Sequence, residues 1–116
     1  MNVEELSKAV AERLGIPSHD YKELRFNKPD NELWLIDDTK RMAELAVEYD
    51  ICISLDEWII TKHATNSYER ETTKAISAYF VDKNRYHELD VAINDHPSKL
   101  HAWRYVIGLA LLEVEV

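Results

Sequence analysis

The stretch NDHPSKLHAWRYVIGLALLEV, residues 94–114, decides the fold, because it predicts a closing helix that is apolar on most of its surface. Pro97 is tolerated in a first helical turn and Ser98 is a good cap. The principal stripe is Leu100, Trp103, Ile107, Ala110, Leu111 and Val114, widened by Val106, Leu109 and Leu112. Such a helix is either central to the core or covered by a partner. Gly108 costs about 1 kcal/mol relative to alanine there, which indicates a close backbone contact.

Two further helices are predicted upstream. Residues 2–14 have apolar positions at helical spacing, with Asn2 as N-cap and a stop at Gly15. The second should follow the capping residues Asp37-Asp38-Thr39 and run to about Tyr49. The buried face of this second helix should consist of Met42, Leu45, Ala46 and Tyr49. Between the two helices we expect at most a short strand, at Tyr21–Phe26.

After the second helix the apolar period changes from 3.6 to two. Asp50–Leu55 alternates apolar with small or polar residues, and Trp58–His63 is rich in strand formers. A turn at Asp56-Glu57 would join them into a hairpin with Ile51, Ile53 and Leu55 facing the core.

Residues 64–82 are ambiguous between helix and strand. A helical stripe with Asn66 as cap fits them slightly better, although Ile76, Ala78 and Phe80 alternate as in a strand. Residues 89–93 predict another strand. We therefore expect a single α+β domain over residues 1–116: a small, mostly antiparallel sheet covered by helices in two or three layers, like an α/β/α sandwich.

Composition excludes several classes of protein. A chain of 116 residues can bury a hydrophobic core without disulfide or metal cross-links. Its one cysteine, Cys52, permits no intrachain disulfide. Gly15 and Gly108 are isolated, so no phosphate-binding glycine loop is present. The N-terminal residues do not resemble a secretory signal, and no apolar run is long enough to span a bilayer. We expect a cytoplasmic protein that does not bind membranes.

The net charge of −8 argues against direct binding to nucleic acid, which needs clustered lysine and arginine. The excess lies mainly in residues 30–57, which carry nine acidic and two basic residues. A tryptophan beside such a segment can anchor a protein interface. The candidate partner-binding residues are Trp34, Asp37, Asp38, Glu44 and Glu48. The alternative is a solvated acidic surface, with Asp37 and Asp38 serving as helix caps.

Neither the histidines nor the cysteine has the spacing of a known site. His96 and His101 are five residues apart and would not share a helix face, while His63, His87 and His96 could meet only through tertiary structure. Cys52 should be a small core or subsurface residue rather than a nucleophile. We therefore expect no catalytic residues, no metal and no cofactor.

The patterns of residues 33–63 and 94–113 together resemble the small phage ABA-sandwich domain proteins of bacteriophages and prophages. The resemblance rests on Leu33-Trp34-Leu35-Ile36-Asp37-Asp38, on Ile51-Cys52-Ile53 and Trp58-Ile59-Ile60, and on the apolar helix after His96-Pro97. It implies an α/β/α sandwich and expression in an infected bacterium, and it supplies no catalytic residue. Residues 65–86 depart from the family's pattern.

The expected function is that of a non-enzymatic phage accessory protein that binds a host or phage protein, with a host defence system as one candidate target. One alternative is an acidic mimic of nucleic acid, and another is a small hydrolase dependent on His63, His87 or His96. The surplus apolar surface of the last helix would also permit a homo-oligomer.

Overall fold

The computed structural model describes residues 1–17, 34–64 and 67–115, and for residues 56–64 and 67–73 it describes the backbone alone. The elements in chain order are α1 (Val3–Leu14), η1 (Leu35–Asp37), α3 (Thr39–Glu48), β1 (Cys52–Ala64), β2 (Ser67–Asp82), β3 (Arg85–Ala92), η2 (Ile93–Asp95) and α4 (Lys99–Leu111). The expected fold class, an α+β fold with helices and an antiparallel sheet, is confirmed.

Helix α1 begins and ends at the predicted residues. The Asn2 side chain accepts a hydrogen bond from the Glu5 N–H at 2.8 Å, and Gly15 takes the left-handed conformation (φ 70°) that ends the helix. Ser7 on its buried face accepts a hydrogen bond from the Ile36 N–H at 3.1 Å. Since Ile36 lies in η1, this bond fastens the 3-10 turn to α1.

Helix α3 also matches its prediction, except that Tyr49, expected on its buried face, is its half-buried C-cap. Its buried residues are Met42, Leu45 and Ala46. The chain then reverses through Asp50, which has a positive φ of 55°, and the Ile51 N–H donates to the Ala46 carbonyl at 2.8 Å. This left-handed residue, a conformation usually taken by glycine, directs the chain from α3 into β1.

Helix α4 is central to the core, which is one of the two alternatives that its composition left open. Its fully enclosed residues are Ala102, Val106, Ile107, Gly108, Ala110 and Leu111. The close backbone contact expected at Gly108 is confirmed: a Cβ there would lie 2.6 Å from Ile36 Cδ1 and 3.0 Å from Leu6 Cδ2. Leu100, predicted to lie in the buried stripe, is instead 48% exposed, because the first turn of α4 lies at the rim of the core.

The sheet has the order β1-β2-β3, and both pairings are antiparallel. The β1–β2 ladder runs from Cys52 opposite Tyr79 to Ala64 opposite Ser67. The β2–β3 ladder is shorter, from Ala75 opposite Ala92 to Asp82 opposite Arg85. Lys83 and Asn84 join β2 to β3 with φ values of 47° and 63°, which is the geometry of a tight two-residue hairpin turn.

Three sequence predictions in the middle of the chain are wrong. Asp56 and Glu57 form no turn, because β1 continues from Cys52 to Ala64. Residues 67–82 form a strand rather than a helix, since β1 pairs with residues 67–79 and β3 pairs with residues 75–82. Leu55, expected to face the core, is 49% exposed because β1 is the outer strand of the sheet. The strand expected at Tyr21–Phe26 and the Asn66 cap lie outside the described residues.

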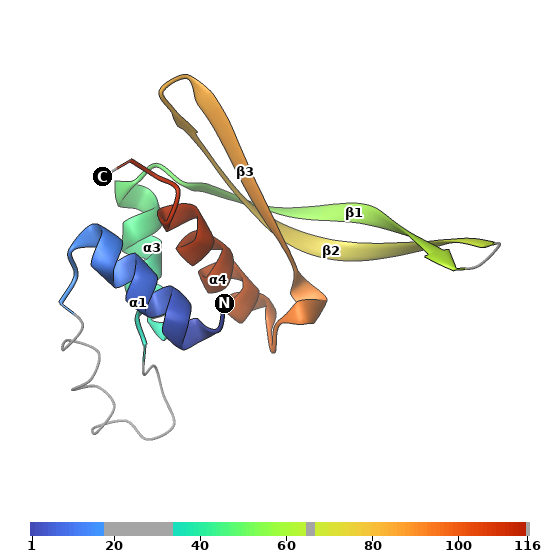
Figure 1. Ribbon diagram of the computed structural model, residues 1–116, viewed down its shortest axis with the longest axis horizontal. Helices are drawn as coiled ribbons and strands as arrows, with labels where there is room; N and C mark the ends of the chain where they lie inside the picture. The colour runs from blue at the N-terminus through green and yellow to red at the C-terminus, as the bar shows by residue number, and fades with distance from the viewer. Residues whose placement is uncertain (18–33, 65–66, 116) are drawn as a thin grey trace.

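The helices lie together on one side of the sheet (Figure 1). Among the described helices, α4 packs on β2 and β3, while α1 and α3 pack against α4. The described residues therefore form two layers, of the two or three that the sequence allows. No described helix is both long and apolar enough to cross a membrane.

The far ends of β1 and β2, residues 58–64 and 67–73, extend away from the helices as a two-stranded ribbon, which we call the arm (Figure 1). The arm makes the molecule elongated, with extents of 53 × 39 × 20 Å. The radius of gyration is 16.1 Å, whereas a compact domain of this length has a radius of about 13 Å.

Candidate functional site

The predicted acidic site lies on η1 and α3, and part of it has a structural role. Asp38 Oδ1 accepts a hydrogen bond from the Arg41 N–H at 3.0 Å, so Asp38 is the N-cap of α3. Glu44 lies 3.6 Å from the Arg41 guanidinium. Asp37 is half-buried and Glu48 is exposed. The capping alternative is therefore correct for Asp38, and the structure does not test whether these acids bind a partner.

Trp34 lies at the start of η1 and is half-buried. The ammonium of Lys8 on α1 lies 5.6 Å from the centroid of its ring, a cation–π distance. Lys8 also pairs with Glu4 at 3.0 Å. Trp34 thus contributes to the contact between α1 and η1, with part of its surface still open to solvent.

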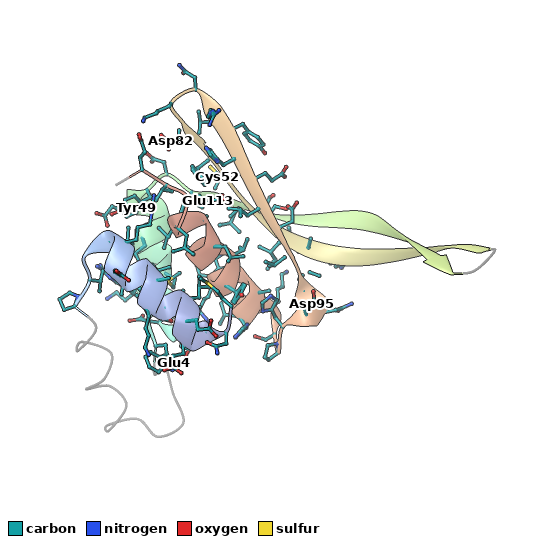
Figure 2. The ribbon with its side chains drawn as sticks, viewed as in Figure 1. Glu4, Tyr49, Cys52, Asp82, Asp95 and Glu113 are labelled. Atoms are coloured by element: carbon teal, nitrogen blue, oxygen red, sulfur yellow. The ribbon has the colours of Figure 1, made fainter. Side chains whose placement is uncertain are left out.

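Cys52 is exposed, so its predicted place in or just below the core is wrong. It is the first residue of the outer strand β1, on the sheet face opposite to Ile53, which packs against the core (Figure 2). His87 stacks on Phe80 with 4.7 Å between ring centroids. The side chain of His63 lies outside the described residues. Among the described side chains, no contact joins His87 to His96.

His96 and His101 do meet, although their spacing predicts otherwise. Their Nδ1 atoms lie 2.9 Å apart, because His96 precedes α4 and its ring folds back over the first turn. Tyr105 extends the cluster, with its ring centroid 4.8 Å from that of His96. The tyrosine hydroxyl donates to the Met1 carbonyl at 2.5 Å.

This histidine cluster lines an open hollow of about 600 Å³ between α4, β3 and the start of α1. Asp90 and Asp95 also line it, and Asp95 lies on η2 next to the start of α4 (Figure 2). Burial, and then the charge of His101, lower the pKa of His96 below its ordinary value of 6.5. In the described residues no three histidine, cysteine or carboxylate side chains come together in a way that could hold a metal ion.

A second, apolar hollow of about 420 Å³ opens where α3, α4 and β2 meet. Its lining residues are Thr39, Ile76, Lys99, Leu100 and Trp103. Leu55 stands directly opposite Ile76 in the sheet register, so the two share a sheet face and Leu55 extends the apolar surface. Leu100 and Leu55 are about half exposed, at 48% and 49%.

Sequence reasoning missed the apolar hollow, because helical periodicity gives Leu100 the same angular position as buried residues further along the stripe. One signal was available. The first turn of a closing helix is where an apolar stripe can extend past the element beneath it, and Trp103 is a residue type enriched in protein interfaces.

Comparison with known proteins found no match: no family model, no curated protein and no solved structure is similar to this chain. The phage ABA-sandwich resemblance therefore stays a prediction from the sequence.

Proposed function

We propose that this protein works by binding another protein, without catalysing a reaction, and that the apolar hollow receives an apolar side chain of that partner. The observation that carries the proposal is Leu100, which is 48% exposed beside the half-buried Trp103 at the mouth of the hollow. A large aliphatic residue next to a tryptophan and a hollow is the arrangement of an interface anchor.

The charges around the hollow suggest the chemistry of the partner. Thr39 lines the hollow, and Asp37 and Asp38 directly precede it in the chain. Lys99 also lines the hollow, so a partner segment with an apolar residue, basic residues towards Asp37 and Asp38, and an acidic residue towards Lys99 would complement these features. We propose that the partner is a host or phage protein, in keeping with the phage-like sequence pattern, and a host defence protein is one candidate.

The test compares two exposed aliphatic residues. Leu100→Ser changes the mouth of the hollow, whereas Val47→Ser is a matched control on α3, where Val47 is 79% exposed. The wild-type protein, immobilised, should capture a specific protein from a bacterial lysate. Its affinity should fall at least about tenfold in Leu100→Ser and stay unchanged in Val47→Ser. Equal capture by Leu100→Ser, or no specific capture by the wild type, would contradict the proposal.

The acidic contribution needs variants that preserve the helix cap. Asp37→Lys reverses a charge two residues before Thr39, which lines the hollow, and Asp38→Asn removes a charge while keeping a side chain that can cap α3. We expect both variants to capture the partner more weakly than the wild type does. Their capture should also fall less steeply than that of the wild type as salt is added. Capture that is insensitive to both substitutions would limit the interface to the apolar hollow.

A second candidate function, histidine-dependent hydrolysis, is favoured by one observation, the contact between His96 and His101 in the larger hollow. A histidine with a lowered pKa is neutral near pH 7 and can act as a general base. Chromogenic ester, phosphoester and amide substrates test this candidate. Turnover that is present in the wild type and lost in His96→Gln would establish it, and absence of turnover would reject it for these substrate classes.

A further inference from the structure

β1 is the outer strand of the described sheet and has a neighbouring strand, β2, on one side only. On the other side of the ribbon, β3 pairs with β2 only from Ala75 onward, so neither outer edge of the arm has a neighbouring strand among the described residues. In an antiparallel ladder, about half of the backbone N–H and C=O groups of an outer strand point away from its neighbour. A long edge of this kind pairs readily with another strand.

Strand β1 of a second copy of the chain is one such strand, and symmetry limits the registers in which the two strands can pair. In a two-fold antiparallel pair, residue i faces residue j and residue j faces residue i. Directly opposite residues share a sheet face, and side chains alternate between faces along a strand. The positions i and j therefore differ by an even number, and one residue at the centre faces its own copy.

Centring the pair on Ile59 gives a complementary register. Asp56 of one copy stands opposite Lys62 of the other, and Trp58 stands opposite Ile60. Each of these pairings occurs twice, once on either side of the axis. Opposite charges and aromatic–β-branched pairs at directly opposed positions stabilise a sheet by roughly 0.2–1 kcal/mol each.

Neighbouring registers and the other edge are less favourable. Centring on Ile60 places Lys62 opposite Trp58, and the Asp56–Lys62 pairing is lost. On the free edge of β2, the residues Glu69, Arg70 and Glu71 follow one another. Any two-fold register centred on one of these three places a charge opposite its own copy, which is destabilising. The edge of β1 thus offers a two-fold register with complementary charges, which these three centres on β2 do not.

We propose that two copies of this protein associate through the outer edges of β1, antiparallel and centred on Ile59, so that two three-stranded sheets become one continuous sheet. The observation that carries this proposal is the free β1 edge together with the charge complementarity of Asp56 and Lys62. None of the residues that line the apolar hollow lies on β1, and Leu100→Ser leaves the β1 edge unchanged, so the dimer and the proposed protein partner can be tested separately.

The first experiment is sedimentation equilibrium of the full chain over a wide concentration range, for the wild type, Asp56→Lys, Lys62→Asp and the exchange Asp56→Lys/Lys62→Asp. Each single variant opposes like charges across the axis, so we expect the dimer dissociation constant to rise about tenfold. The exchange restores opposite charges and should return it to about the wild-type value. A wild type that is monomeric throughout, single variants that dimerise as the wild type does, or an exchange that fails to restore dimerisation would overturn the proposal.

A matched control separates the dimer from the hairpin itself. Lys62 stands opposite Glu69 within the same chain, whereas Asp56 stands opposite the uncharged Ala75. Glu69→Gln removes the charge at the register position opposite Lys62 and leaves the sequence of β1 unchanged, so we expect wild-type dimerisation and wild-type circular dichroism. Loss of the dimer in Glu69→Gln would mean that the integrity of the arm, rather than the Asp56–Lys62 pairing, controls association, and would overturn the proposed register.

Disulfide formation reports directly which residues of the two β1 strands lie opposite each other. In a Cys52→Ser background, Ile59→Cys places a thiol opposite its own copy, whereas Ile60→Cys places it opposite residue 58 of the other chain. Under mild oxidation we expect Ile59→Cys to form covalent dimers faster than Ile60→Cys. Faster dimer formation by Ile60→Cys, or none by either variant, would overturn the register centred on Ile59.

Discussion

The helical body and the arm differ in what surrounds each stretch of backbone. In the body, α4 is enclosed by α1, α3, η1 and the sheet, so closely that Gly108 leaves no space for a Cβ beside Ile36. In the arm, each strand has one neighbour, and both outer edges are unpaired in the described chain. An isolated two-stranded ribbon is at best marginally stable in water. We infer that the body supplies the stability of the fold, and that the arm supplies backbone for association.

The largest expected effect is a cavity in the body. Leu6 is completely buried and approaches Gly108, so Leu6→Ala should lower the free energy of unfolding by about 3 kcal/mol. Val47→Ala, at a position that is 79% exposed, is the control and should change it by less than about 0.5 kcal/mol. Urea denaturation measures both values. A loss in Leu6→Ala no larger than in the control would contradict the assignment of stability to the body.

The next effect concerns the cap of α3. Asp38→Ala removes the acceptor for the Arg41 N–H and should cost about 1 kcal/mol, whereas Asp38→Ser keeps a capping oxygen and should cost less. Asp37→Ala, one residue earlier, removes a carboxylate that does not cap the helix. Thermal unfolding of the three variants should rank Asp38→Ala as the least stable, and equal stability of Asp38→Ala and Asp37→Ala would argue against the capping role.

Shortening the arm should have a smaller effect. Replacing residues 59–72 by Asn-Gly leaves residues 58 and 73 as the closing pair of a two-residue hairpin. We expect the free energy of unfolding, measured on monomeric protein, to change by less than about 1 kcal/mol. A variant that fails to fold, judged by circular dichroism and denaturation, would show that the arm belongs to the stable core and would remove the distinction between the two regions.

The smallest effect is a pH dependence from His96. Burial and His101 lower its pKa in the folded state, so the unfolded chain binds the proton more readily. Stability should be highest above about pH 6.5, the ordinary pKa, and should decline as the pH falls below it. His96→Asn should remove this part of the decline. Titration by NMR should give His96 a pKa below 6.5, raised towards that value in His101→Asn. An unshifted pKa in the wild type would contradict the geometry of the cluster.

Local features of the sequence determined the three described helices. Asn2, Asp38 and Ser98, all residues of the predicted capping segments, cap α1, α3 and α4, although Pro97, expected in the first turn of α4, precedes its cap. The reason is that backbone hydrogen bonds in a helix join residues four apart, so the capping residues and the apolar spacing that predict a helix all lie within one short segment of the sequence. The central position of α4 and the contact at Gly108 also follow from this spacing.

Tertiary structure decided the rest, because the outcome depended on residues distant in the chain. Residues 67–82 fit two periods, and the ladder with β1 made them a strand. The same ladder carried β1 through Asp56 and Glu57 without a turn. His96 met His101 because η2 and Pro97 bring the chain back over the first turn of α4. Leu100 was left at the surface because the core ends beneath it, and only the packing of α4 on the sheet fixes where the core ends.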